Sequence, residues 1–105
     1  MKNEYGEELD RNGYAPSIAG KMDRCFVCGR RDRALQRHEA IHGAYRTKSK
    51  NLGLWVNVCD ICHDQIHHHN AEMDLRMKQD IQALAMKHYK WEIGEWLRNF
   101  GKNYI

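Results

Sequence analysis

The chain has 105 residues, of which 42% are hydrophobic and 30% are charged, and its formal net charge is +3. A chain of this length forms one domain with a modest core, so we expect a single domain over residues 1–105. No apolar run approaches the stretch of about 20 residues that a membrane span requires. The first residues are acidic and form no apolar leader, so we expect no secretory signal and a cytoplasmic location, with reduced thiols.

Residues 1–22 are predicted to form an extended N-terminal arm. Asn12-Gly13 and Pro16, the only proline, favour turns and extended backbone. Tyr14 and Ile18 are expected to dock the arm on the domain core. After the arm, Cys25-Phe-Val-Cys28 is expected in a knuckle-like turn, with Gly29 in the left-handed conformation that such turns need.

Two strands are predicted next, over Leu35–Ile41 and Leu54–Val58, because both segments are rich in strand-forming residues. They are expected to pair as a hairpin. The segment between them, Gly43–Gly53, is polar, basic and bounded by glycines, so it is predicted to be an exposed loop.

The C-terminal half is predicted to be helical. A first helix is expected over Asp60–His67, and Asn70 is a candidate cap for a longer one. Along that helix, side chains recur at three- and four-residue steps, as a core-facing stripe requires. The stripe is Met73, Met77, Ile81, Leu84 and His88. A short final helix is expected around Trp96 and is closed by Gly101. The tryptophans are interpreted as packing residues.

Four cysteines in two CxxC pairs are the most specific signal in the chain. Two intervening residues let a tight turn aim both sulfurs at one point, so the pairs predict a tetrahedral Zn²⁺ site. Its ligands are Cys25, Cys28, Cys59 and Cys62. A four-thiolate site has no open coordination position, so its role is structural. Two disulfides, or redox chemistry at either pair, fit the expected reducing location and the lack of a βαβ pattern less well.

His63 and His67 follow the second CxxC and are four residues apart, so a helix places them on one face. Together with the cysteines they make six potential ligands, which indicates two separate metal sites.

Positive charge is concentrated in residues 21–50, which hold nine basic and three acidic residues and therefore a net charge of +6. A basic block beside a metal cluster is typical of proteins that bind a phosphate backbone. The candidate nucleic-acid-binding residues are Arg37, Arg46, Lys48 and Lys50. The alternative is a solvated basic loop, since charge runs alone specify little.

The chain resembles the HNH, or ββα-metal (His-Me finger), endonuclease superfamily in the order of its predicted elements, which is strand, basic loop, strand and helix. It also has a histidine on the first strand and two more, His63 and His67, on the helix. More narrowly, it resembles the small HNH proteins of bacteriophages and prophages. The resemblance extends from residues 11–18 through 53–56 to 100–105. It implies an α+β fold in which a zinc-stabilised ββα-metal core over residues 23–69 follows the arm and precedes additional C-terminal helices over residues 70–105.

The resemblance also implies site residues. In the superfamily the first strand carries a metal ligand followed by a histidine that activates water, and the helix adds further histidine ligands. These positions correspond to His38, Glu39, His63 and His67. His38, His63 and His67 would then hold a catalytic divalent metal such as Mg²⁺, Mn²⁺, Ni²⁺ or Zn²⁺, and His38, Glu39 and His63 would be catalytic.

Two positions depart from the superfamily pattern. Glu39 stands where a histidine is usual, and a glutamate titrates well below neutral unless it is buried. Either Glu39 serves as the base, or His38 or His42 does. Leu54 stands where the asparagine of the family name is expected, and the nearby candidates are Asn51 and Asn57.

The function expected from these patterns is a metal-dependent endonuclease acting on DNA in a bacterial cell. The alternative is a zinc-ribbon-like nucleic-acid-binding protein that has lost cleavage. A third reading arises because residues 38–42 match HExxH, which on a helix would form a zinc metallopeptidase site. Gly43 would end such a helix at once, so the peptidase reading is the least favoured.

Overall fold

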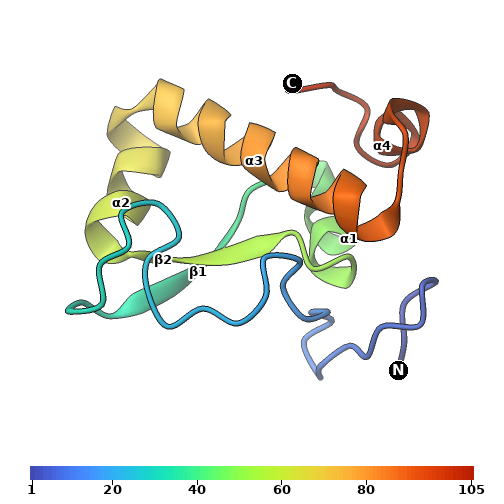
Figure 1. The fold of residues 1–105 in the computed structure, drawn as a ribbon, viewed down its shortest axis with the longest axis horizontal. Coiled ribbons are helices and arrows are strands. Elements are labelled where there is room, and N and C mark those ends of the chain that lie inside the picture. The colour runs from blue at the N-terminus through green and yellow to red at the C-terminus, as the bar shows by residue number, and fades with distance from the viewer.

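The two predicted strands form an antiparallel pair in the computed structural model, which describes residues 1–105 as an α+β fold with one two-stranded sheet and four α-helices (Figure 1). The elements in chain order are β1 (Leu35–Glu39), α1 (Arg46–Asn51), β2 (Trp55–Cys59), α2 (Asp60–Asp64), α3 (Ala71–Tyr89) and α4 (Ile93–Phe100). The pairing of the strands is confirmed, although β1 ends at Glu39, before the predicted Ile41. Residues 38–42 therefore do not lie on a helix, as a metallopeptidase HExxH motif would.

The register of the sheet separates the side chains of β1 into two sets. His38 lies opposite Val56, and Gln36 lies opposite Val58. Val56 and Val58 are fully buried, so His38 and Gln36 share the face that looks toward the core. Side chains alternate along a strand, so Arg37 and Glu39 belong to the outer face.

The prediction of an exposed loop over Gly43–Gly53 is wrong. This segment contains a single turn of 3₁₀-helix at Gly43–Tyr45, the helix α1, and the buried residues Ser49 and Leu52. Sequence patterns could not reveal α1 because it carries no apolar stripe, and a polar side chain anchors it. The Ser49 hydroxyl donates a hydrogen bond to the carbonyl oxygen of Ile41, just after β1.

We expect Ser49→Ala to lower the free energy of unfolding by about 1–3 kcal/mol, because it leaves the buried Ile41 carbonyl without a donor. Chemical denaturation would measure the change. Thr47→Ala, an exposed position on the same helix, is the matched control and should change stability by less than about 0.5 kcal/mol. Equal effects of the two substitutions would contradict the anchoring role of Ser49.

The helices predicted after β2 are confirmed, as are the cap at Asn70 and the end at Gly101. Asn70 caps α3, since its side-chain oxygen accepts a hydrogen bond from the Met73 N–H at 3.0 Å. Met77 and Ile81 of the predicted stripe are buried, whereas His88 is exposed. α4 ends at Gly101, which adopts the left-handed conformation with φ of 74°. No helix combines the length and the apolar composition needed to cross a membrane.

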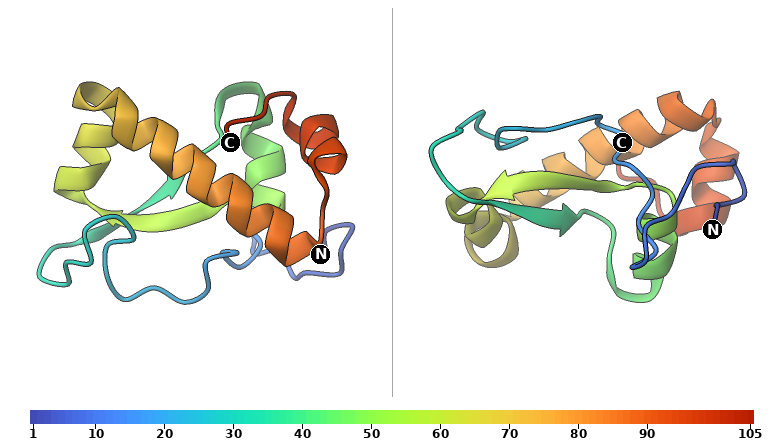
Figure 2. Two further views of the ribbon diagram at one scale, coloured as in Figure 1. Left: turned by 45° about the horizontal axis from the view of Figure 1, so that its top comes forward. Right: turned by 90° about the horizontal axis from the view of Figure 1, so that it is seen from below.

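α3 and the N-terminal arm lie on opposite sides of the sheet (Figure 1). Both views of Figure 2 place α4 beside α1, where the rings of Tyr45 and Phe100 lie 6.0 Å apart between centroids. The C-terminal helices and α1 therefore support the end of the sheet remote from α2.

The arm contains no helix, as predicted, and backbone hydrogen bonds fasten it to the segment before β2. The Ala15 N–H donates to the Lys50 carbonyl, and the Ile18 N–H donates to the Gly53 carbonyl. A β-carbon at Gly53 would lie 2.2 Å from the Pro16 carbonyl oxygen, so only glycine permits this approach. Ile18 packs against the core, as predicted.

Candidate metal centres

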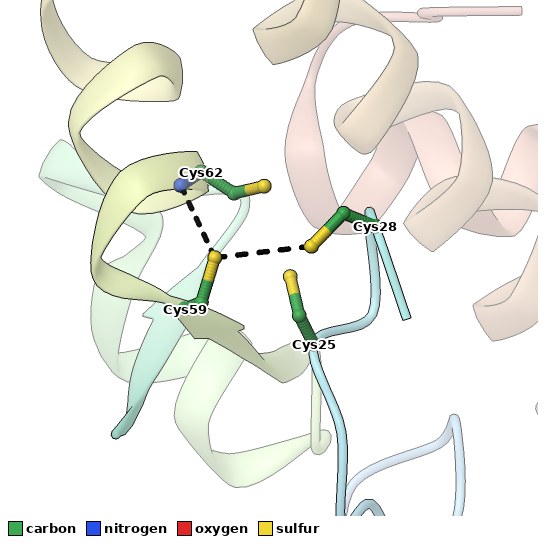
Figure 3. A group of neighbouring side chains, drawn as sticks. All are labelled: Cys25, Cys28, Cys59 and Cys62. Atoms are coloured by element: carbon green, nitrogen blue, oxygen red, sulfur yellow. Dashed lines mark hydrogen bonds between the residues drawn. The ribbon is translucent and has the colours of Figure 1, made fainter. Parts of the chain in front are cut away.

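The four cysteines converge on one point, although two come from the loop before β1 and two from the junction of β2 and α2 (Figure 3). Their sulfur atoms all lie within 4.8 Å of one another, and the Cys28 and Cys59 sulfurs are 3.9 Å apart. Tetrahedral zinc with bonds of about 2.3 Å would separate its sulfur ligands by about 3.8 Å. The four residues are therefore close enough together to hold a metal ion such as zinc.

Local backbone structure explains why the first pair points inward. The Gly29 N–H donates to the Cys25 carbonyl at 2.9 Å and closes a tight turn, and Gly29 has the predicted positive φ, at 75°. The Phe26 N–H donates to the Asn57 carbonyl at 2.9 Å, which fastens the turn to β2. In the second pair, the Cys62 N–H donates to the Cys59 sulfur at 3.4 Å.

The charge state of the sulfurs also fits a cation. Burial raises the pKa of Cys25, but backbone N–H groups of Cys28, Cys59 and Val27 outweigh it and bring the pKa to about 6. Burial, together with the neighbouring sulfurs, raises the pKa of Cys62. One thiolate is thus favoured while further negative charge is penalised, and a bound cation would remove that penalty.

A second cluster contains three of the predicted ligands, His38 from β1 with His63 and His67 from the segment after β2. One ligand nitrogen from each residue lies within 4.8 Å of the others. The Nε2 atoms of His63 and His67 are 3.0 Å apart. His38 is only 2% exposed, and its Nε2 has no hydrogen-bond partner. Burial of a nitrogen without a hydrogen-bond partner costs free energy unless a ligand binds to that nitrogen. The histidine cluster therefore fits a metal ion.

Burial favours the neutral form of two residues of this cluster. Burial, together with the proximity of His67 and His63, lowers the pKa of His38 to about 4. Burial also lowers the pKa of His63, with a second contribution from His67. Both imidazoles are therefore neutral near pH 7, which is the form that binds metals.

His67 lies in a π-helical turn that follows α2. After one turn of α2, residues Gln65–His69 form a π-helix, and the Asn70 N–H donates to the Gln65 carbonyl at 2.8 Å, five residues back. The predicted helix over Asp60–His67 is thus confirmed as a helical segment with a wider second turn. The rings of His63 and His67 lie 4.5 Å apart between centroids.

Gln36 is a site residue that the sequence did not reveal. Its Oε1 atom lies 2.6 Å from His63 Nδ1, on the side of the ring away from His67. Gln36 precedes His38 by two residues on β1, so a strand places both on one face. That spacing is the only signal in the sequence, and it gains meaning only once β1 is known to face α2.

Glu39, predicted as a catalytic residue, lies on the outer face of the sheet and is not part of the histidine cluster. The Tyr14 hydroxyl donates to Glu39 Oε1 at 2.6 Å, and Arg46 Nε donates to the same oxygen at 3.2 Å. Burial raises the pKa of Glu39, but these two partners outweigh it, so the pKa lies below its usual value. A catalytic role for Glu39 stays a prediction.

Three of the four predicted nucleic-acid-binding residues gather around Tyr14. The Arg37 guanidinium lies 3.9 Å from the Tyr14 ring centroid and 4.3 Å from that of Trp55. Lys50 Nζ lies 4.8 Å from the Tyr14 ring, and Arg46 reaches the same group through Glu39. Lys48 is exposed, and its place two residues from both Arg46 and Lys50 on α1 turns it away from them.

Two other histidines lie outside both clusters. His69 pairs with Asp64 at 3.2 Å, and His88 pairs with Glu7. Of the alternatives for the family asparagine, Asn57 lies opposite Arg37 in the sheet, and the Asn51 carbonyl accepts a hydrogen bond from the Asn3 side chain at 2.7 Å. No protein-family model matches the chain, and neither a curated protein nor a solved structure is significantly similar to it.

Proposed function

We propose that the protein is a metal-dependent endonuclease of the HNH type, of phage or prophage origin, that hydrolyses DNA phosphodiester bonds at the cluster of His38, His63 and His67. The observation that carries the proposal is the buried Nε2 of His38, which lacks a partner and lies beside two further imidazoles. Three imidazoles would form an open site, since three ligands leave coordination positions for phosphate and water.

The two clusters would have different tasks. Cys25, Cys28, Cys59 and Cys62 would hold a structural Zn²⁺ that fastens the loop before β1 to the start of α2. The histidines would hold a divalent ion, which supplies neutralisation of the phosphate charge and stabilisation of the leaving oxygen. His38 would be the rigid ligand because it is buried, whereas His67 is exposed and borders the side open to solvent.

The outer face of the sheet is the proposed backbone-binding surface. Arg37, Arg46 and Lys50 surround Tyr14 there, and strand β1 joins this surface directly to His38. Stacking on the Tyr14 and Trp55 rings holds the Arg37 guanidinium in place. An ordered guanidinium loses less freedom when it contacts phosphate.

One observation supports the alternative of a nucleic-acid-binding protein without cleavage. The carboxylate of Glu39 faces away from the histidines and is held by Tyr14 and Arg46. If no other group activates water, the fold would still bind DNA through its basic residues but would not cut it.

Nicking of supercoiled plasmid tests the proposal. Zinc-loaded protein should convert plasmid to open circles with at least one of Mg²⁺, Mn²⁺, Ni²⁺ or added Zn²⁺, and should not do so without added metal. DNA binding is measured in parallel by fluorescence anisotropy at two salt concentrations. Retained binding without cleavage in all four metals would support the binding protein instead.

A further inference from the structure

The hydrogen bond between Gln36 and His63 determines which nitrogen of His63 faces the histidine cluster. Gln36 Oε1 can only accept, so the 2.6 Å contact requires a proton on His63 Nδ1. A neutral imidazole carries one proton, which leaves a lone pair on His63 Nε2. That atom lies 3.0 Å from His67 Nε2, inside the cluster.

We propose that Gln36 is a positioning residue that fixes His63 in the Nδ1–H tautomer and thereby prepares Nε2 as a metal ligand. The inference rests on the proposed function for the identity of the site. Ligand histidines commonly donate their second N–H to a carbonyl or carboxylate oxygen, which fixes the ring orientation and raises the basicity of the ligand nitrogen. The side-chain amide of Gln36 provides such an oxygen from a different element, β1.

The same geometry assigns a proton to His67 when no metal is bound. With a lone pair on His63 Nε2, the 3.0 Å contact requires an N–H on His67 Nε2. For its Nε2 atom to bind a metal ion, His67 would have to release that proton or move it to Nδ1. His67 is exposed, so water can exchange the proton, whereas the buried His38 has no such route. Gln36 therefore keeps a lone pair on His63 Nε2, whereas His67 has to lose or move a proton before its own Nε2 can bind a metal ion.

The test compares Gln36→Ala and Gln36→Glu with the parent protein. The tautomer of His63 is measured by ¹⁵N chemical shifts of the zinc-loaded protein before any second metal is added. We expect Nδ1–H in the parent and in Gln36→Glu, which keeps an oxygen acceptor, and a shift toward Nε2–H in Gln36→Ala. Affinity for Ni²⁺, measured by calorimetry, should fall by about 10- to 100-fold in Gln36→Ala and recover most of this loss in Gln36→Glu.

Gln79→Ala is the matched control, because the Gln79 side chain is also held by a hydrogen bond, but it lies on α3 and donates its amide N–H to the Tyr104 carbonyl. It should leave both the tautomer and the Ni²⁺ affinity unchanged. A parent protein with His63 in the Nε2–H form, or Gln36→Ala with parental tautomer and affinity, would overturn the inference. Failure of the parent to bind Ni²⁺ would instead overturn the proposed function, since the tautomer measurement needs no second metal.

Discussion

Replacement of Cys59 by serine is expected to abolish cooperative folding and the stoichiometric binding of zinc. Cys59 is fully buried at the end of β2, its sulfur is 3.9 Å from that of Cys28, and it accepts the Cys62 N–H. Structural zinc contributes about 10–16 kcal/mol in zinc-finger peptides, which rivals the about 5–15 kcal/mol that holds a whole domain folded. Zinc content by mass spectrometry and urea denaturation followed by circular dichroism measure the two effects.

Val58→Ala is the control for that experiment because Val58 is also fully buried and precedes Cys59 on β2, but it is not a ligand. It should cost about 1–3 kcal/mol of stability while zinc stays bound. A Cys59→Ser protein with the parental denaturation midpoint would contradict the structural role of the thiolate cluster. So would a folded parent protein that contains no zinc.

The second large effect is expected from His63→Ala, which should lower metal-dependent plasmid nicking by at least about 100-fold, because it removes a direct ligand and even the partners of ligands contribute about 10- to 100-fold. His63 is not part of the thiolate cluster, so zinc content and the denaturation midpoint should remain close to those of the parent. Initial nicking rates at saturating metal, together with zinc analysis, measure the outcome.

His69→Ala is the matched control, since His69 lies in the same helical segment but pairs with Asp64 outside the histidine cluster. Its nicking rate should stay within about threefold of the parent. Unchanged nicking in His63→Ala would remove this cluster from the reaction. Loss of zinc in His63→Ala would show instead that the two clusters are not separate.

The elements that the sequence predicted well are those with short-range signals. Asn70 caps α3 because its side chain bonds a backbone group only three residues away. Gly29 and Gly101 end a turn and a helix through their own backbone conformation. α1 was missed because its one buried side chain, Ser49, is polar, and its partner Ile41 belongs to another segment. No periodicity of hydrophobic residues marks such a helix.

The candidate sites follow the same rule. Each CxxC pair and the His63–His67 pair are defined by spacing within one turn, and the structure brings both sets together. The contacts of Gln36 with His63 and of Tyr14 with Glu39 join residues 27 and 25 positions apart. Such contacts depend on the register of β1 and on the path of the arm, which local patterns do not specify. The position of Glu39 on the outer face follows directly from that register.

The junction between β2 and α2 links the two candidate metal sites. Cys62 and His63 are consecutive residues, yet Cys62 belongs to the thiolate cluster and His63 to the histidine cluster. We expect metal binding by Cys62 to fix the first turn of α2, which carries His63 toward His38 on β1. We therefore expect the thiolate site to bind its metal before the histidine site does. If the histidine cluster is the proposed nuclease site, we expect that magnesium would not restore cleavage to zinc-depleted protein, because the second site would lack its support.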